Sequence, residues 1–378
     1  MKIAFITSHI NRSTQWNWFS EELNDRKIEH IHIIINEKYP ILADDLKAMG
    51  VKVYYLRHDG VFSIIRNFFK TIWYIRKEKI TLVHTEMPMG NFIGQLSAFF
   101  TGIKMRVTTC ENTTWAFDFR SKKQLFIDRL TYRLAKKVIA LTTEAQTFLL
   151  NVLKVPQEKV SVIHHSLKAQ EYLSTTPEQV AALRKELEIE DNIFLIGMVA
   201  RFEYWKGHKY AIEAFARLIK EYPNLRLYIF GSKGESFNSI MEQISEYKLE
   251  KYIKYKGFIS NNIALFHLFD VHLHVPIRAE SETFGINIME GMISGCAQVL
   301  TLSGISCFTA RKEENCLVVD YCSSVDIYIA LKRLIEDPEL GKRLGQNAKA
   351  DALKYFQYEE KVNRHLELYE NLRKELGL

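Results

Sequence analysis

Two carboxylates, Glu282 and Glu290, are separated by seven residues in a segment that holds a Phe-Gly turn and the start of an apolar helix. Gly285 lets the backbone approach a ligand closely, and the helix after it would offer free N–H groups to a phosphate. Glu282 precedes this helix and would face a ligand bound at its N-terminus. Glu290 lies one turn inside, where it could accept paired hydrogen bonds from ribose hydroxyls. The spacing suits a sugar nucleotide, although two solvated acids beside a surface turn would look the same.

Two cations follow an expected buried strand at 193–200. Arg201 comes directly after this strand, and Lys206 follows five residues later, before a stretch with helical spacing of its apolar residues. Ligands of parallel sheets bind beyond the carboxyl ends of the strands. A guanidinium and an ammonium at that edge could therefore neutralise a diphosphate and stabilise its departure. Solvated loop cations are the common alternative, but the position after a strand favours the anion site.

Short apolar runs alternate with amphipathic stretches along most of the chain, which predicts parallel sheets covered by helices on both faces. The strands expected in the first half are 2–7, 30–35, 51–56, 81–84, 105–109, 137–141 and 160–163. Those expected in the second half are 193–200, 225–230, 253–257, 271–275, 297–301 and 316–319. Two such series predict an α/β protein with two Rossmann-like, doubly wound domains that face an interdomain cleft.

The break between the two series falls at 167–191, which contains turn residues and a polar helix expected at 179–187. We therefore expect a first domain at 1–168 and a second at 169–359. Chains of 378 residues commonly form more than one domain.

Composition is that of a soluble globular protein, with 47% hydrophobic and 25% charged residues. No apolar stretch is long enough to span a membrane, and the first residues resemble a strand rather than a signal peptide. The five cysteines lack zinc-type spacing, which favours free thiols in a reducing cytoplasm. Histidines near strand ends also lack the helical spacing of a zinc site. They are His9, His84, His164, His165, His272 and His274.

Several spaced segments resemble, in order, those of the retaining glycosyltransferases of family 4. They are Ala-Arg201-Phe-Glu-Tyr-Trp-Lys206-Gly-His, Tyr-Ile-Phe-Gly231-Ser, Tyr-Lys-Gly257-Phe-Ile-Ser, and the run from Glu282 through Glu290 to Gly295. The resemblance covers nearly all of 191–378 and is loose over 1–165. It implies the GT-B fold, two Rossmann-like domains, with a C-terminal helix at about 360–378 that crosses back onto the first domain.

The same resemblance implies retaining transfer of a sugar from a nucleotide diphosphate, UDP or GDP, to a hydroxyl, without a metal or cofactor. Arg201 and Lys206 would hold the diphosphate, Glu282 the hydroxyls of the donor sugar, and Glu290 the ribose. Backbone groups at four positions would meet the sugar and phosphates, and two others would lie beside the base. These are Phe284, Gly285, Ile286 and Asn287, and then Gly231 and Phe258. The sequence has no Asp-x-Asp pair to hold a magnesium ion.

The chain departs from the family in its first half. Where the family has a Gly-Gly turn, this chain has Asn11, Arg12 and Ser13, whose side chains could donate hydrogen bonds to the donor or contact the acceptor. Glu111 takes the place of a family His that bonds the transferring sugar, and a carboxyl there would require different hydroxyls or a protonated state. His84 is a further acceptor-side candidate, with a structural histidine as the alternative. The catalytic candidates are therefore Glu282, Arg201, Lys206 and Glu111.

Basic residues are concentrated in the first half, where residues 1–180 hold 25 Lys and Arg against 17 Asp and Glu. Two basic, partly aromatic stretches, 61–79 and 119–137, could contact an anionic membrane and so serve a lipid-linked saccharide acceptor. We expect the apolar residues of the first stretch to cover the sheet and its cations to point outward. Those apolar residues are Phe62, Ile65, Phe69, Ile72 and Trp73. No nucleic-acid-binding module is evident.

The sequence thus predicts a cytoplasmic hexosyl- or N-acetylhexosaminyl-transferase for polysaccharide, lipopolysaccharide or glycoconjugate synthesis, with possible peripheral contact at the inner face of the cytoplasmic membrane. An NAD-dependent oxidoreductase is a rival from another class, disfavoured because neither first strand is followed by Gly-x-Gly-x-x-Gly. A catalytically silent nucleotide-sugar-binding protein of the same fold is a second rival, suggested by Glu111 and the missing Gly-Gly turn. A phosphorylase or a nucleotide-sugar epimerase is a minor alternative.

Overall fold

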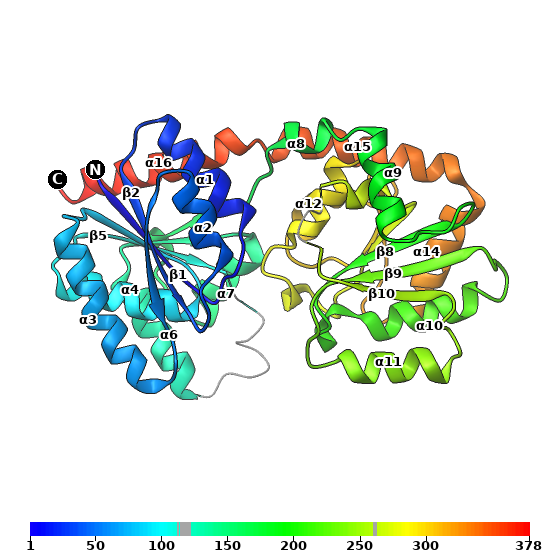
Figure 1. Ribbon diagram of the computed structural model, residues 1–378, viewed down its shortest axis with the longest axis horizontal. Helices are drawn as coiled ribbons and strands as arrows, with labels where there is room; N and C mark the ends of the chain where they lie inside the picture. Colours follow the sequence, from blue (N-terminus) through cyan, green and yellow to red (C-terminus); the bar gives the residue numbers. More distant parts are fainter. Residues whose placement is uncertain (112, 114–121, 260–262) are drawn as a thin grey trace. The chain divides into compact units, whose positions relative to one another are not determined.

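The computed structural model describes residues 1–111, 113, 122–259 and 263–378. The chain divides into two compact units, Met1–Ser166 with Tyr358–Leu378 and Leu167–Gln357 (Figure 1). We call them the N-terminal unit and the C-terminal unit, and each is described by itself. Both contain a parallel sheet with alternating helices, so the predicted α/β class is confirmed. Every strand expected from the sequence is present, with ends within one residue of those predicted.

The N-terminal unit has a seven-stranded sheet in the order β3-β2-β1-β4-β5-β6-β7. The strands are β1 (Ile3–Ser8), β2 (His30–Asn36), β3 (Lys52–Arg57), β4 (Leu82–Thr85), β5 (Met105–Cys110), β6 (Lys137–Ala140) and β7 (Val160–Val162). β1, β2, β4 and β5 are buried along their whole length, and apolar residues or threonine occupy most of their positions.

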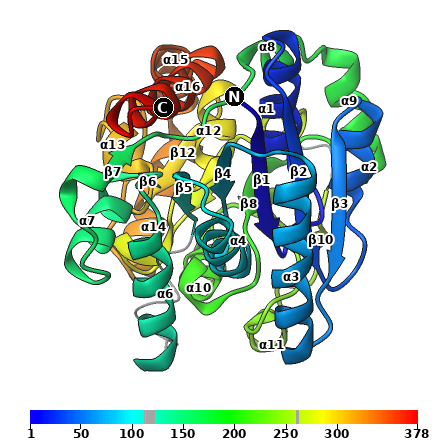
Figure 2. The same cartoon turned by 90° about the vertical axis from the view of Figure 1, so that its left-hand side faces the viewer.

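Helices cover this sheet. They are α1 (Thr14–Asp25), α2 (Ile41–Ala48), α3 (Val61–Lys77), α4 (Pro88–Phe100), α6 (Lys122–Leu134), α7 (Thr143–Asn151) and α16 (Tyr358–Glu375). α4 packs against both α3 and α6, and Figure 2 shows these three helices side by side along the sheet. A 3-10 turn, η1 (Gln157–Lys159), precedes β7.

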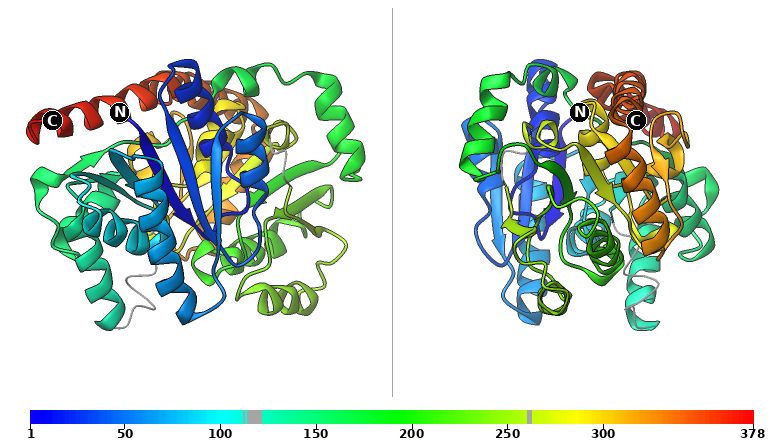
Figure 3. Two further views of the ribbon diagram at one scale, coloured as in Figure 1. Left: turned by 60° about the vertical axis from the view of Figure 1, so that its left-hand side comes forward. Right: turned by 90° about the vertical axis from the view of Figure 1, so that its right-hand side faces the viewer.

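The C-terminal helix α16 belongs to the core of the N-terminal unit, where it lies beside α1 (Figure 1, Figure 3). The buried Tyr369 hydroxyl lies 2.6 Å from Nδ1 of His84, and Nε2 of His84 lies 2.8 Å from Oγ1 of Thr109. Lys361 donates from Nζ to Oε1 of Gln15 at 2.6 Å. The helix is therefore held by buried polar contacts in addition to apolar packing.

The C-terminal unit has a six-stranded sheet in the order β10-β9-β8-β11-β12-β13. The strands are β8 (Phe194–Val199), β9 (Leu225–Phe230), β10 (Ile253–Gly257), β11 (Val271–His274), β12 (Ala297–Leu300) and β13 (Leu317–Val318). The helices are α8 (Ala169–Leu173), α9 (Pro177–Glu186), α10 (His208–Leu218), α11 (Phe237–Glu246), α12 (Ile286–Ile293), α13 (Ser306–Thr309), α14 (Ser324–Glu336) and α15 (Pro338–Tyr355). Short 3-10 turns occur at η2 (Tyr204–Lys206), η3 (Leu265–His267) and η4 (Ala279–Ser281). Its core joins the apolar sides of β8, β9 and β11 to those of α10 and α14.

One packing prediction is wrong. The five apolar residues of α3 that were expected to cover the sheet do not, because Phe62, Ile65, Phe69 and Trp73 are 89%, 58%, 62% and 54% exposed, and Ile72 is only partly buried. The helix turns a different stripe inward, Ser63, Asn67, Thr71 and Ile75. The helical period was correct, but apolar spacing alone does not show which side of a helix faces the sheet. Among the described residues, no helix has the length and hydrophobicity needed to cross a membrane.

The contact between α16 and β4 gives a stability prediction. Replacing Tyr369 with Phe removes the hydroxyl that His84 bonds and leaves a buried ring nitrogen without this partner. We expect the free energy of unfolding in urea to fall by about 1–3 kcal/mol. Tyr247→Phe, at a side chain that is 44% exposed, is the control and should be close to neutral. Equal stability of the two variants would contradict the structural role of the Tyr369 hydroxyl.

Candidate functional site

The loop after β8 carries the two predicted phosphate-binding cations, Arg201 and Lys206. Gly207 ends this loop with φ +78°, and a Cβ atom there would lie 1.9 Å from the carbonyl oxygen of Val275. Only glycine allows this approach, because other side chains would clash with the backbone. The loop is thereby pressed against the residue that follows β11, which brings Lys206 beside the end of that strand.

Lys206 forms an ion pair with Glu282, a residue predicted to contact the donor sugar. Both side chains are largely buried. Nε2 of His274, the last residue of β11, lies 3.2 Å from the same carboxylate oxygen. Burial by itself would raise the pKa of Glu282, but Lys206 and His274 more than offset burial and lower the pKa to about 2. Glu282 is therefore ionised at neutral pH, although it is buried.

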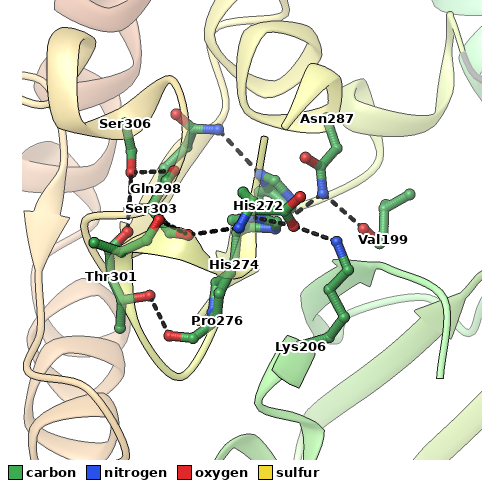
Figure 4. Close-up of polar contacts among 12 residues, drawn as sticks. Val199, Lys206, His272, His274, Pro276, Asn287, Gln298, Thr301, Ser303 and Ser306 are labelled. Atoms are coloured by element: carbon green, nitrogen blue, oxygen red, sulfur yellow. Dashed lines mark hydrogen bonds and ion pairs between the residues drawn. The ribbon is translucent and has the colours of Figure 1, made fainter. Parts of the chain in front are cut away.

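Asn287 determines which nitrogen of His274 carries the proton. Its Nδ2 donates to the carbonyl oxygen of Val199 at 2.7 Å and lies 2.9 Å from Nδ1 of His274 (Figure 4). An amide nitrogen can only donate, so Nδ1 of a neutral His274 is the acceptor and Nε2 carries the hydrogen. That hydrogen is on the side of Glu282. Lys206 and His274 thus converge on one carboxylate, and Asn287 of α12 orients the histidine.

The backbone of Glu282 is also fixed. Its N–H donates to Oγ of Ser303 at 3.0 Å, and Ser303 donates in turn to the carbonyl oxygen of Ala279 at 2.9 Å. Oγ of Ser306 accepts from the N–H of Ser303 at 2.7 Å (Figure 4). A Cβ atom at Gly304 would lie 2.4 Å from the carbonyl oxygen of Phe284, so glycine is required for this packing. Two adjacent loops therefore hold the carboxylate in one place.

Helix α12 begins directly after this loop. Gly285 is its N-cap with φ +90°, a left-handed conformation that favours glycine. The first N–H groups of such a helix are available to an anion, and two residues of the predicted run, Ile286 and Asn287, stand at the start of this helix. Inside the helix, the buried Glu290 accepts a hydrogen bond from the hydroxyl of Tyr172 on α8 at 3.0 Å. Burial and the nearby Glu290 raise the pKa of Tyr172, so its hydroxyl stays protonated and donates.

The other donor-side candidates are placed at the same edge of the sheet. Arg201 pairs with Glu203, with Nε and Oε1 3.0 Å apart, and does not share the carboxylate that Lys206 contacts. Its side chain is half exposed. A Cβ atom at Gly231 would lie 2.2 Å from the carbonyl oxygen of Ala200, so the backbone is tightly packed after β9. Phe258 follows β10 and is 69% exposed.

Glu111 belongs to the N-terminal unit, directly after β5. Its Oε1 lies 3.2 Å from Nε2 of His165. Glu86, at the end of β4, is hydrogen-bonded to Glu111 and accepts from Nε1 of Trp16 at 2.6 Å. Burial raises the pKa of both carboxyl groups, and the charge of Glu111 raises that of Glu86 further. Hydrogen bonding to Glu86 and the charge of Lys361 partly offset burial at Glu111, so the proton of the pair is favoured on Glu86.

The remaining acceptor-side candidates include one correction. Both ring nitrogens of His84 are engaged inside the unit, by Tyr369 and Thr109, so the structural alternative holds and His84 is not an acceptor contact. Ser13 is the N-cap of α1 and accepts from the N–H of Trp16 at 3.2 Å. Oδ1 of Asn11 accepts from the N–H of Ile41 at 3.3 Å. Arg12 is exposed.

Sequence reasoning missed two contributors, His274 and Tyr172. His274 stands at the carboxyl end of a strand, but its spacing had been tested only against zinc sites. Its position eight residues before Glu282, at the edge where ligands bind, was the available signal. Tyr172 is in a five-residue helix within the expected interdomain segment, and no pattern distinguishes it there.

Comparison with known proteins identifies the family of the chain. Residues 179–351 match the family model "Glycosyl transferases group 1", and residues 19–170 match "Glycosyltransferase Family 4". The putative glycosyltransferase EpsD of Bacillus subtilis is 24% identical over 281 residues, 72% of each chain. The Escherichia coli UDP-Gal:alpha-D-GlcNAc-diphosphoundecaprenol alpha-1,3-galactosyltransferase is 21% identical over 353 residues, which are 90% of this chain and 88% of the relative.

A solved structure shows the same fold. Anabaena HepE, crystallised in complex with UDP-glucose, superposes with a TM-score of 0.83 at 19% identity, over 98% of this chain and all of that one. Its likeness supports the GT-B architecture predicted from the sequence. The two family models together span both units. The chain belongs to the glycosyltransferases of group 1 and family 4, which transfer sugars from nucleotide donors.

Proposed function

We propose that this protein is a retaining, metal-independent glycosyltransferase that moves a sugar from a nucleotide diphosphate to a hydroxyl of a saccharide or lipid-linked glycan. The observation that carries the proposal is the buried, ionised Glu282, held by Lys206 and His274 next to the start of α12. A buried carboxylate with fixed partners is suited to accept hydrogen bonds from sugar hydroxyls in a defined orientation.

The donor diphosphate meets positive charge from three sources in this arrangement. Lys206 supplies an ammonium, Arg201 a guanidinium, and α12 the free N–H groups of its first turn. Negative charge develops on the diphosphate as the sugar leaves, and fixed cations stabilise that charge most in the transition state. The departing phosphate oxygen then takes the proton of the acceptor hydroxyl, so no protein base is required on that face.

Glu290 is assigned to the ribose. One of its oxygens is bonded to Tyr172, and a carboxylate has further acceptor positions for hydroxyl groups. The loops at Gly231 and Phe258 are assigned to the base, mainly through backbone groups. In the N-terminal unit, Glu111 is assigned to the transferred sugar, and Arg12, with backbone near Asn11 and Ser13, to the acceptor.

Two similar proteins support the choice of a UDP-sugar donor. The name of the Escherichia coli relative specifies UDP-galactose and an undecaprenol-diphosphate-linked acceptor, and the Anabaena protein was crystallised with UDP-glucose. We therefore assign a UDP-hexose or UDP-N-acetylhexosamine donor, with a GDP-sugar as the alternative, in surface polysaccharide, lipopolysaccharide or related glycoconjugate synthesis. A lipid-linked acceptor implies peripheral contact with the inner face of the cytoplasmic membrane. Nucleic acid is not a proposed partner.

Loss of either phosphate-side cation tests this function. We expect Lys206→Ala and Arg201→Ala each to lower kcat for transfer by about 10²–10³-fold, since removal of a single transition-state contact costs about 3–4 kcal/mol. Lys209→Ala, at an exposed lysine in the first turn of α10, is the matched control and should retain native activity. The assay is nucleotide release and product formation with UDP-sugars. A native rate in Lys206→Ala, with the fold intact, would contradict the diphosphate assignment.

His274 is proposed as a positioning residue that acts through Glu282. His274→Leu removes the contact to the carboxylate and the acceptor for Asn287, whereas His274→Gln keeps an amide donor for Glu282. We expect kcat to fall by about 10–100-fold in His274→Leu, from the loss of a hydrogen bond to a charged group. The loss should be several-fold smaller in His274→Gln, and the KM for the donor should change less than kcat. Equal losses in two folded variants would refute this role.

A further inference from the structure

The outward side of the N-terminal unit has an exposed apolar surface built on α3. Val61 and Phe62 are 76% and 89% exposed, and both lie in the first turn of the helix. The surface, which we call the aromatic face, continues onto α4 and α6. Its residues are Val61, Phe62, Ile65, Phe69 and Trp73 of α3, Phe99 and Phe100 of α4, and Phe126 and Leu130 of α6. Single exposed apolar residues are common, but a group this large is not.

Ring contacts make this surface continuous. Phe68 of α3 lies 5.2 Å from Phe69 and 5.7 Å from Phe100 of α4, measured between ring centroids, and Phe99 lies 5.7 Å from Phe100. α6 packs against the other side of α4, and the three helices lie side by side in Figure 2. The exposed rings of α3 and α4 are therefore linked, and α6, which carries Phe126 and Leu130, is the next helix beside α4.

The inward side of α3 explains why these aromatic residues stay outside. Nδ2 of Asn67 donates to the carbonyl oxygen of Arg57 at 3.0 Å, and Oγ of Ser63 lies 2.7 Å from Nδ1 of His58. Rotating the helix to bury its aromatic residues would break these bonds and leave buried polar groups unpaired. The exposure of the aromatic face is therefore fixed by the fold.

Positive charge surrounds the aromatic face. Exposed cations on or beside it are Arg66, Lys70, Arg76, Lys77, Lys104, Arg129 and Arg133. Nζ of Lys77 lies 4.6 Å from the ring centroid of Trp73. The acidic residues near these helices are either paired with a cation or buried, so they do not cancel this positive charge. Asp59 pairs with Arg66 at 3.0 Å, Glu78 is buried and pairs with Lys52 at 3.1 Å, and Asp128 is buried.

We propose that the aromatic face binds the surface of an anionic lipid bilayer, with Phe62, Phe69 and Trp73 at the boundary between headgroups and acyl chains. Aromatic residues flanked by Lys and Arg suit that boundary. The rings contact the acyl chains, and the cations contact the anionic headgroups. A second copy of this chain fits less well, because a symmetric contact would place like-charged rims opposite each other.

The position of the face relates membrane binding to the reaction. Val61 follows the end of β3 by four residues, so the first turn of α3 lies near the carboxyl edge of the sheet. Glu111, Arg12 and the loop after β1 are at the same edge, where ligands of such sheets bind. A glycan on a lipid that remains in the bilayer would reach this edge. This link to the acceptor rests on the proposed function, whereas the lipid contact itself does not.

The test is flotation of the full chain with two kinds of vesicle, one of phosphatidylcholine alone and one of phosphatidylcholine with about 30% phosphatidylglycerol. The anionic lipid gives the second kind a negative surface. We expect the bound fraction to be at least about tenfold larger with the anionic vesicles and to fall as salt is raised. The triple variant Phe62→Ser/Phe69→Ser/Trp73→Ser should lose at least about tenfold in binding to them. The control is Phe308→Ser/Val325→Ser/Ile329→Ser, which removes three comparably exposed apolar residues from the C-terminal unit and should bind as the native chain does.

Several outcomes would overturn the proposal. They are equal binding to both vesicles, native-like binding by the triple variant, or a native dimer that the triple variant abolishes without any lipid binding. Transfer assays separate this proposal from the proposed function. The triple variant should act normally on a water-soluble saccharide acceptor and poorly on a lipid-linked acceptor in vesicles. A native chain that floats but transfers no sugar would count against the proposed function and leave the lipid contact supported.

Discussion

The site in the C-terminal unit depends on a buried negative charge. A carboxylate removed from water is strongly destabilised unless it is paired and hydrogen-bonded, and Glu282 is paired with Lys206 and contacted by His274. Because its pKa is lowered to about 2, its ionisation contributes stability that is complete above the ordinary value of 4.5 and is lost as pH falls towards 2. Gly207, Gly304, Ser303 and Asn287 occupy the positions that these contacts require.

Both units follow the same construction, in which a parallel sheet brings polar residues together at its carboxyl edge. In the C-terminal unit these residues hold an ionised carboxylate beside cations. In the N-terminal unit Glu111 and Glu86 share a hydrogen bond, and burial raises the pKa of each. One unit thus favours a charged carboxylate and the other a protonated one, and the difference comes from the cation that Lys206 supplies. Lys361 of α16, whose own pKa is lowered to about 8 by burial, offsets only part of this effect in the N-terminal unit.

Much of the fold could be predicted from the sequence, because short apolar runs between amphipathic stretches are compatible with few folds other than a parallel sheet covered by helices. Glu282 and Lys206 were each predicted as site residues, since both lie in loops between the end of a strand and the start of a helix, but their ion pair was not predicted. The side that α3 turns inward was not predicted, because Ser63 and Asn67 are buried through hydrogen bonds that depend on the neighbouring loop, and Thr71 is buried on the same side. His274 and Tyr172 were missed for a similar reason, since their partners are distant in sequence. His84 shows the opposite error, a strand-end histidine whose nitrogens are used by the core.

The most direct test of the account is a thermal-shift titration of the native chain with UDP, GDP, ADP, CMP and NAD, repeated on the Arg201→Ala/Lys206→Ala double variant. A ligand present at a hundred times its Kd stabilises the folded state by about 2.7 kcal/mol, which gives a measurable rise in Tm. We expect a nucleoside diphosphate, UDP first, to raise the Tm of the native chain and to leave that of the double variant nearly unchanged. A response to NAD alone, or an equal response in both proteins, would contradict the diphosphate site on which the account is built.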